Sequence, residues 1–123
     1  MEKVRAIRGA TTVASDTREE ILSATRELIK KILHRNCLEP EKVISAFFTV
    51  TPDLTAAFPA EAVRQLGYTQ WPAIGSVEMP VPDALDHCIR VMLHIYLDSQ
   101  QKIEHVYIHG AQALRPDRVN NED

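Results

Sequence analysis

The sequence has little of what marks a metal site or a membrane span. Its two cysteines, Cys37 and Cys88, show no CxxC spacing, and its five histidines form no HExxH pair. His105 and His109 would lie about 13 Å apart along a strand, too far to share an ion. No apolar run approaches the ~20 residues that cross a bilayer. We therefore expect no metal, no cofactor and no membrane partner.

Basic charge is scarce as well. Lysine and arginine number 14 against 17 acidic residues, which gives a formal net charge of -3. A protein that binds a phosphate backbone carries a basic stripe or an excess of basic residues, so we expect no nucleic-acid partner. Any site for an anion must then be a local concentration of arginines within an acidic body.

Length and cysteine count give two further expectations. The 123 residues predict one domain over 1–117, followed by a mobile polar tail at 118–123. An even number of cysteines allows a disulfide, but the lack of a signal peptide favours free thiols and a cytoplasmic location. The composition, 45% hydrophobic and 25% charged, excludes neither an enzyme nor a binding protein.

Strand-like and helix-like segments alternate along the chain. Two helices are expected among the strands, so the order predicts an α+β fold, a five-stranded mixed sheet with both helices on one side. The last expected strand contains Gly110, where we expect a bend. The five expected strands cover residues 4–13, 43–50, 72–79, 88–97 and 103–114.

Both predicted helices carry end signals. Apolar residues spaced three and four apart from Ile21 to Leu33 predict an amphipathic helix of roughly five turns. Thr17 and Glu20 fit a capping box at its start, and Asn36 is a candidate cap at its end. The second helix is the segment PAEAVRQL, with proline first and glycine just after its last residue.

The strands over 43–50 and 88–97 are apolar on both faces. Such strands need a second covering layer, and the sequence has no further helix to provide it. Either the sheet curls on itself or neighbouring subunits cover it, and we expect an oligomer.

Arg90 interrupts one of these apolar strands, in the run Cys88-Ile89-Arg90-Val91-Met92-Leu93. A guanidinium stays charged at any accessible pH, so an apolar setting must provide partners for its five donors. Two interpretations are open. The side chain can extend past the apolar surface to water, or it can bind a planar anion such as a carboxylate through two parallel bonds.

Other residues with candidate roles have equally plain alternatives. Arg64 and Arg115 read as surface charges, Glu78 as an acid at a strand end, and Tyr107 as a core aromatic. Arg8 interrupts the first strand much as Arg90 interrupts the fourth. Taken singly, none of them indicates a function.

Taken together, several short motifs resemble a known family. The chain is similar, over residues 4–117, to the small monofunctional chorismate mutases with a trimeric pseudo-α/β-barrel fold. Six segments in the same order carry the resemblance: Arg8-Gly9-Ala10-Thr11-Thr12, Thr51-Pro52-Asp53-Leu54, Phe58-Pro59-Ala60 with Arg64, Glu78-Met79 with Cys88-Ile89-Arg90-Val91, His105-Val106-Tyr107, and Leu114-Arg115-Pro116-Asp117.

The resemblance implies conversion of chorismate to prephenate, in clefts between adjacent subunits of a homotrimer. It implies that Arg90 contacts the ether oxygen and a carboxylate of chorismate, while Arg8 and Tyr107 contact a carboxylate. Glu78 would accept a hydrogen bond from the substrate hydroxyl and hold Arg90. The remaining implied substrate contacts are Phe58, Ala60 and Arg64 from the neighbouring subunit, Ala73, Ile74 and Gly75, and the closing segment Leu114 and Arg115.

The chemistry of this reaction suits the sequence. An intramolecular rearrangement needs no nucleophile, base or metal. It is accelerated by holding the substrate in its compact conformer and by placing positive charge where negative charge develops. A non-catalytic trimeric protein that binds a small anion on the same scaffold is the alternative, although such a protein would need neither Arg90 at an ether oxygen nor Glu78 at a hydroxyl.

Two positions depart from the family pattern. Glu61 stands where some members have a lysine, and we expect it to pair with Arg64 on the same helix. Gly75 stands where a small polar side chain often contributes to the site. Its contact is lost, or is taken over by Ser76 or by backbone groups.

Overall fold

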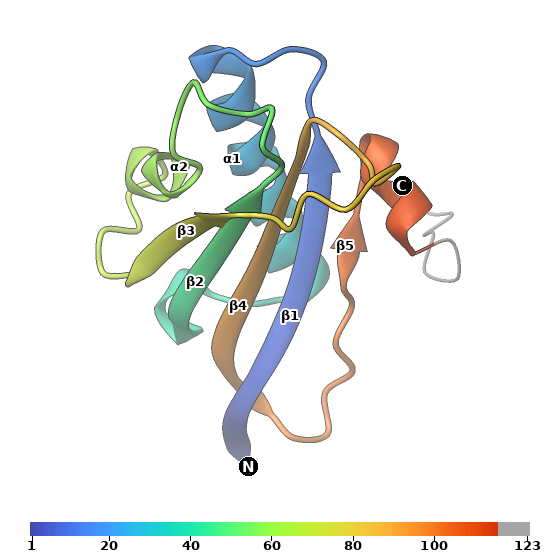
Figure 1. Cartoon of the computed structure of the whole chain (residues 1–123). Helices are drawn as coiled ribbons and strands as arrows, with labels where there is room; N and C mark the ends of the chain where they lie inside the picture. The colour runs from blue at the N-terminus through green and yellow to red at the C-terminus, as the bar shows by residue number, and fades with distance from the viewer. Residues whose placement is uncertain (116–123) are drawn as a thin grey trace.

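A computed structural model describes residues 1–115 and contains a five-stranded mixed sheet with two α-helices on one side (Figure 1). This confirms the predicted fold class. Residues 116–123 lie outside the described residues, and so does the predicted tail at 118–123. The strands, in the spatial order β3-β2-β4-β1-β5, are β3 (Ala73–Val77), β2 (Val43–Val50), β4 (Cys88–Asp98), β1 (Glu2–Thr12) and β5 (Val106–Tyr107).

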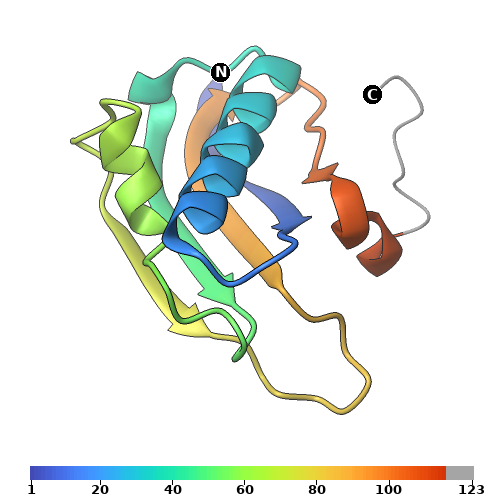
Figure 2. The same cartoon turned by 90° about the horizontal axis from the view of Figure 1, so that it is seen from above.

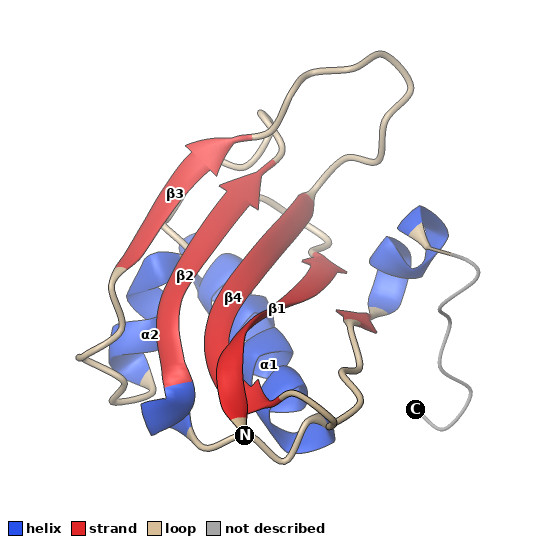
Figure 3. Ribbon diagram, turned by 90° about the horizontal axis from the view of Figure 1, so that it is seen from below, coloured by secondary structure: helices blue, strands red, loops and turns tan. Residues whose placement is uncertain are grey.

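The central strand β4 joins the two halves of the sheet. It is antiparallel to both of its neighbours, β1 and β2, while the edge strands β3 and β5 run parallel to β2 and β1. Helix α1 (Arg18–Arg35) lies across the sheet and α2 (Ala60–Gln65) lies beside it, both against the same face (Figures 2 and 3). The main core between them includes Ile7, Leu28, Ile32, Phe48 and Leu93, all fully buried.

The start of α1 differs from a full capping box. The Thr17 side chain accepts a hydrogen bond from the Glu20 amide at 3.2 Å, as predicted. The Glu20 carboxylate, however, accepts from the amide of Ala14 at 3.1 Å rather than from Thr17, so the reciprocal bond ties the preceding loop to the helix. At the other end Asn36 is the cap, and its buried side chain bonds to the backbone of both Ile32 and Glu104.

The second helix agrees with its end signals. Helix α2 follows Pro59, and Gly67 adopts a φ of 88°, a conformation that favours glycine. Trp71, in the loop to β3, donates its indole N–H to the Pro40 carbonyl of the short 3-10 helix η1 (Pro40–Lys42). The α2–β3 connection is therefore fastened to the residues that precede β2.

The prediction of a long fifth strand is wrong. Strand β5 has only two residues, and the chain continues as a second 3-10 helix, η2 (His109–Leu114). His109 has a φ of 55°, which takes it out of the extended conformation. The Gly110 amide then donates to the Thr12 hydroxyl at 3.0 Å, at the last residue of β1. Because β1 ends there, a longer fifth strand would have no neighbour to pair with.

The second face of the sheet bears no helix in residues 1–115 and is turned toward the viewer in Figure 1. We call it the open face. Large apolar side chains are exposed on it, with Phe47 at 42%, Ile74 at 67% and Tyr96 at 48%. The covering layer expected from the sequence is therefore not provided by the described part of the chain itself. No helix in that part is long and apolar enough to cross a membrane.

Candidate active site

The open face contains a pocket lined by two arginines. It has a volume of about 230 Å³ and lies over β1, β2, β4 and β5. Alternation along the strands explains its composition, because residues that alternate with the core point to this face. We call it the arginine pocket; its main side chains are Arg8, Phe47, Thr49, Arg90, Met92 and Tyr107.

Arg90 is half exposed and pairs with Glu78. Its Nε lies 3.3 Å from Glu78 Oε2, with side-chain exposures of 45% for the arginine and 25% for the acid. Thr49, which is paired with Arg90 across β2 and β4, donates its hydroxyl to the same oxygen at 3.0 Å. Within residues 1–115, Glu78 Oε1 has only a long contact, 3.4 Å, with the Met79 amide. The head of Arg90 thus reaches solvent, in line with the first interpretation, and it also pairs with a carboxylate of the protein; binding of an anionic ligand stays a prediction.

Arg8 and Tyr107 enter the pocket from the other edge. The β1–β4 register sets Arg8 opposite Met92 and Ala10 opposite Arg90, so the two arginines project from neighbouring strands. Parallel pairing of β5 with β1 sets Tyr107 beside Ala10. The Arg8 amide donates to Nδ1 of His105 at 2.9 Å. This bond lies next to the first of the two residue pairs that join β1 to β5.

The nearest cysteine lies below the pocket and is unsuited to nucleophilic chemistry. Cys88 is 1% exposed and unpaired with another cysteine. Burial raises the pKa of its thiol, an effect that the charge of nearby Arg90 only partly offsets. A neutral thiol is a poor nucleophile, so the groups available at this site are charges and hydrogen-bond donors.

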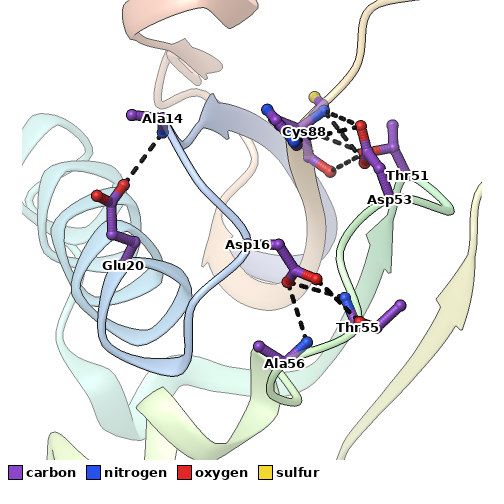
Figure 4. Close-up of polar contacts among 9 residues, drawn as sticks. Ala14, Asp16, Glu20, Thr51, Asp53, Thr55, Ala56 and Cys88 are labelled. Carbon is purple, nitrogen blue, oxygen red and sulfur yellow. Dashed lines mark hydrogen bonds and ion pairs between the residues drawn. The ribbon is translucent and has the colours of Figure 1, made fainter.

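A polar clasp at the start of β4 fixes the strand that carries Arg90 (Figure 4). The Cys88 amide donates to the Thr51 hydroxyl at 3.0 Å, and the Thr51 hydroxyl donates to Asp53 at 2.5 Å. Asp53 also accepts from the His87 amide at 3.0 Å. Burial would raise the pKa of Asp53, but the hydrogen bonds from Thr51 and His87 hold it below its usual value.

This clasp also groups potential metal ligands. Oxygen and nitrogen atoms of Asp53, Asp86 and His87 lie within 4.8 Å of one another. The clasp hydrogen bonds already engage both Asp53 oxygens, which gives the cluster a structural explanation. The sequence analysis predicted no such role for Thr51 and Asp53.

A second carboxylate anchors the loop that leads to α2. Asp16 accepts hydrogen bonds from the Thr55 amide and hydroxyl, each at 2.9 Å, and from the Ala56 amide at 3.0 Å (Figure 4). Hydrogen bonds from Thr55 lower the pKa of Asp16. The anchored loop ends at Phe58, whose side chain is 78% exposed.

A larger cleft lies on the opposite side of the sheet, beside that loop. We call it the helix-side cleft; it has a volume of about 570 Å³ and includes Phe58, Glu61, Gly75 and Arg18 in its lining. The expectation that Glu61 pairs with Arg64 is wrong, because its carboxylate forms an ion pair with Arg18 of α1. Hydrogen bonding from Arg18 lowers the pKa of Glu61. The Arg18–Glu61 pair thus links α1 to α2.

The structure divides the predicted site residues between two places. Arg8, Arg90 and Tyr107 line the arginine pocket, Glu78 bonds to it, and Leu114 packs against a small cluster that contains Tyr107. Arg115 follows as the half-buried cap of η2. The other predicted residues do not reach the pocket: Phe58 and Gly75 line the helix-side cleft, Ala60 and Ala73 pack against the main core, Arg64 is exposed on α2, and Ile74 is exposed on the open face of β3.

The arginine pocket is suited to one class of ligand, a small anion with at least one carboxylate-like group. Two guanidinium groups line it, and the carboxylate of Glu78 pairs with one of them. Comparison with known proteins makes the class specific. The chorismate mutase type I family model matches residues 4–118.

Individual relatives agree with this match. The chain is 47% identical over 116 residues to the chorismate mutase AroH of Bacillus subtilis, covering 93% of this chain and 91% of that protein. It is 48% identical over 116 residues to the AroH of Thermus thermophilus, covering 93% and 95%. A solved chorismate mutase from Clostridium thermocellum superposes with a TM-score of 0.86 at 47% identity, over 89% of this chain and 98% of that one.

The chain therefore belongs to the chorismate mutase type I family, and it is an enzyme of that class. The resemblance inferred from the sequence motifs is confirmed at the level of family, fold and activity.

Proposed function

We propose that the chain converts chorismate to prephenate through Arg90, held by Glu78, in an active site completed by a second subunit. One observation supports this most directly: the Arg90–Glu78 ion pair is made through Nε at 3.3 Å. The terminal amino groups of a guanidinium form the fork that binds carboxylate and ether oxygens, and Arg90 lines the pocket in which we propose that the substrate binds.

The proposed mechanism is electrostatic. As the C–O bond of chorismate breaks and the new C–C bond forms, the ether oxygen gains electron density. Arg90 is already in place and stabilises that charge more in the transition state than in the ground state. Arg8 and Tyr107 bind a carboxylate and hold the substrate in its compact conformer, while Glu78 accepts the hydrogen bond of the ring hydroxyl.

The two half-sites lead us to propose a homotrimer. Phe58 and Gly75 lie on the helix side of the sheet, whereas Arg8 and Arg90 lie on the open face. One chain cannot bring these groups to a single substrate, but two adjacent copies can. Exposed Phe47, Ile74 and Tyr96 provide apolar surface for such a contact. Arg64, Ala60, Ala73 and Ile74 belong to the second copy's wall in this proposal, with Leu114 and Arg115 closing the first copy's side.

The proposal is tested by incubating the purified protein with chorismate and following the loss of ultraviolet absorbance. We expect loss well above the spontaneous rate without added metal or cofactor. Arg90→Lys keeps the charge but loses the planar fork, and we expect it to lower kcat roughly 10²–10³-fold with a smaller change in KM. Arg5→Lys is the matched control, since Arg5 bonds to the backbone of Asp98 away from the pocket.

The outcomes separate the proposed function from its alternative. A non-catalytic protein that binds a small anion on this scaffold would show no loss of chorismate above the spontaneous rate. A normal kcat in Arg90→Lys would contradict the role given to Arg90 while leaving the activity itself established.

A further inference from the structure

We infer that Thr49 is a positioning residue for the reaction, because it fixes the Glu78 carboxylate that holds Arg90. This inference rests on the proposed function and extends it to a residue with no contact assigned to substrate. Thr49 is half-buried, is the next-to-last residue of β2 and lines the arginine pocket.

The two carboxylate oxygens of Glu78 have different surroundings. Oε2 accepts the Thr49 hydroxyl at 3.0 Å and also lies 3.3 Å from Arg90 Nε. Among the described residues, Oε1 has only the long 3.4 Å contact with the Met79 amide. Thr49 therefore determines which oxygen faces Arg90, and it leaves the other oxygen available to accept the substrate hydroxyl.

The backbone makes this contact rigid. Thr49 and Arg90 are directly opposed in the antiparallel β2–β4 ladder, so their side chains share one face. The Glu78 amide donates to the Val50 carbonyl at 2.8 Å, which fixes the acid relative to the same strand. A β-branched side chain on a strand has restricted χ1, so the Thr49 hydroxyl is held in position before substrate arrives.

The bond from Thr49 to Glu78 also affects how Glu78 pairs with Arg90. If Glu78 formed a bidentate pair with Arg90, it would use both its own oxygens and the guanidinium fork. Thr49 provides Oε2 with a second donor, which competes with a fully bidentate Arg90–Glu78 pair. We expect this arrangement to leave donors of the Arg90 guanidinium and Oε1 of Glu78 for the ligand.

The test removes the hydroxyl while keeping the shape of the side chain. We expect Thr49→Val to lower kcat at least about tenfold, as befits a lost hydrogen bond to a charged group, and Thr49→Ser to restore kcat to within about threefold of wild type. Ser45→Ala is the matched control, because Ser45 lies on the same face of β2 and bonds to His94 at 3.2 Å, outside the pocket. Circular dichroism and denaturant midpoints establish that each variant is folded.

A double-mutant cycle separates positioning from a merely structural role. In a Glu78→Ala background there is no carboxylate to position, so we expect Thr49→Val to change kcat by less than about twofold. A loss of about tenfold in that background, or a Thr49→Ser variant as slow as Thr49→Val, would overturn the inference. If Thr49→Val does not fold, the comparison of Thr49→Ser with Thr49→Ala in both backgrounds carries the same test.

Failure of this inference is distinguishable from failure of the proposed function. An active wild type with an unchanged Thr49→Val refutes only the role of Thr49. A wild type that does not consume chorismate refutes the proposed function and the inference with it.

Discussion

The two faces of the sheet are built from the same strands, but within one chain the helices cover one face and leave the other exposed. Toward the helices, β4 presents Ile89, Val91 and Leu93, which are at most 3% exposed. Toward the open face it presents Arg90, with a side chain 45% exposed, and Tyr96 at 48%. One alternating strand thus supplies the core with one set of residues and the proposed active site with the other.

This difference indicates where the structure tolerates change. The helix-covered face is packed to density, so added atoms there must displace neighbours. The open face and the outer edge at β3 have room, and we propose that other copies of the chain fill it. An added methyl group should therefore destabilise the fold at a packed position and change its stability little at a position with room.

The largest stability effect that we predict comes from a pair of glycine substitutions. In Gly9→Ala the new Cβ would lie 2.7 Å from Ile32 Cδ1 and 3.1 Å from the Val106 carbonyl, so the free energy of unfolding should fall by about 1–3 kcal/mol. In the matched Gly75→Ala variant the nearest atom is the Phe48 carbonyl at 3.7 Å, an ordinary contact, so unfolding should change little. Denaturant midpoints measure both, and equal midpoints would contradict the contrast between the two regions.

A smaller effect is predicted at acid pH. Hydrogen bonds from Thr55 lower the pKa of Asp16 in the folded state, so its ionised form stabilises the fold. This contribution is fully present above the unfolded pKa, near 3.8, and is lost as the pH falls through the lower folded value. The stability difference between wild type and Asp16→Asn should therefore shrink below about pH 4. Unfolding curves recorded from neutral to acid pH measure it, and a constant difference would refute the assignment.

Sequence reasoning predicted the elements whose signals are local. The bounds of β2 match the expected 43–50, and the ends of α1 and α2 follow Thr17, Asn36, Pro59 and Gly67. The fifth strand was predicted too long, because its length depends on where β1 ends rather than on its own apolar residues. Pairing between distant strands leaves no local signal in either one.

The same distinction applies to the candidate site. Arg90 was noticeable because it interrupts an apolar run, and the motif resemblance named Arg8, Glu78 and Tyr107. Thr49, Asp16 and Asp53 were missed as functional or organising residues, because ordinary polar residues near strand ends acquire meaning only from distant partners. The polar spacing Thr51-Pro52-Asp53 was visible, but nothing local linked it to the amides of His87 and Cys88.

The most direct test of the central claim is a complementation experiment with two inactive variants. Arg90→Ala damages the arginine pocket, and Arg64→Ala damages the wall proposed to come from the neighbouring copy. When the two variants are mixed in equal amounts and exchange subunits, about one quarter of the sites should be intact. An intact site needs Arg90 from one subunit and Arg64 from its neighbour, and each of these is present in half of the subunits. Sedimentation should show a species of three times the 13.9 kDa chain mass. Mixed oligomers without recovered chorismate consumption would contradict an active site shared between the two faces of the sheet.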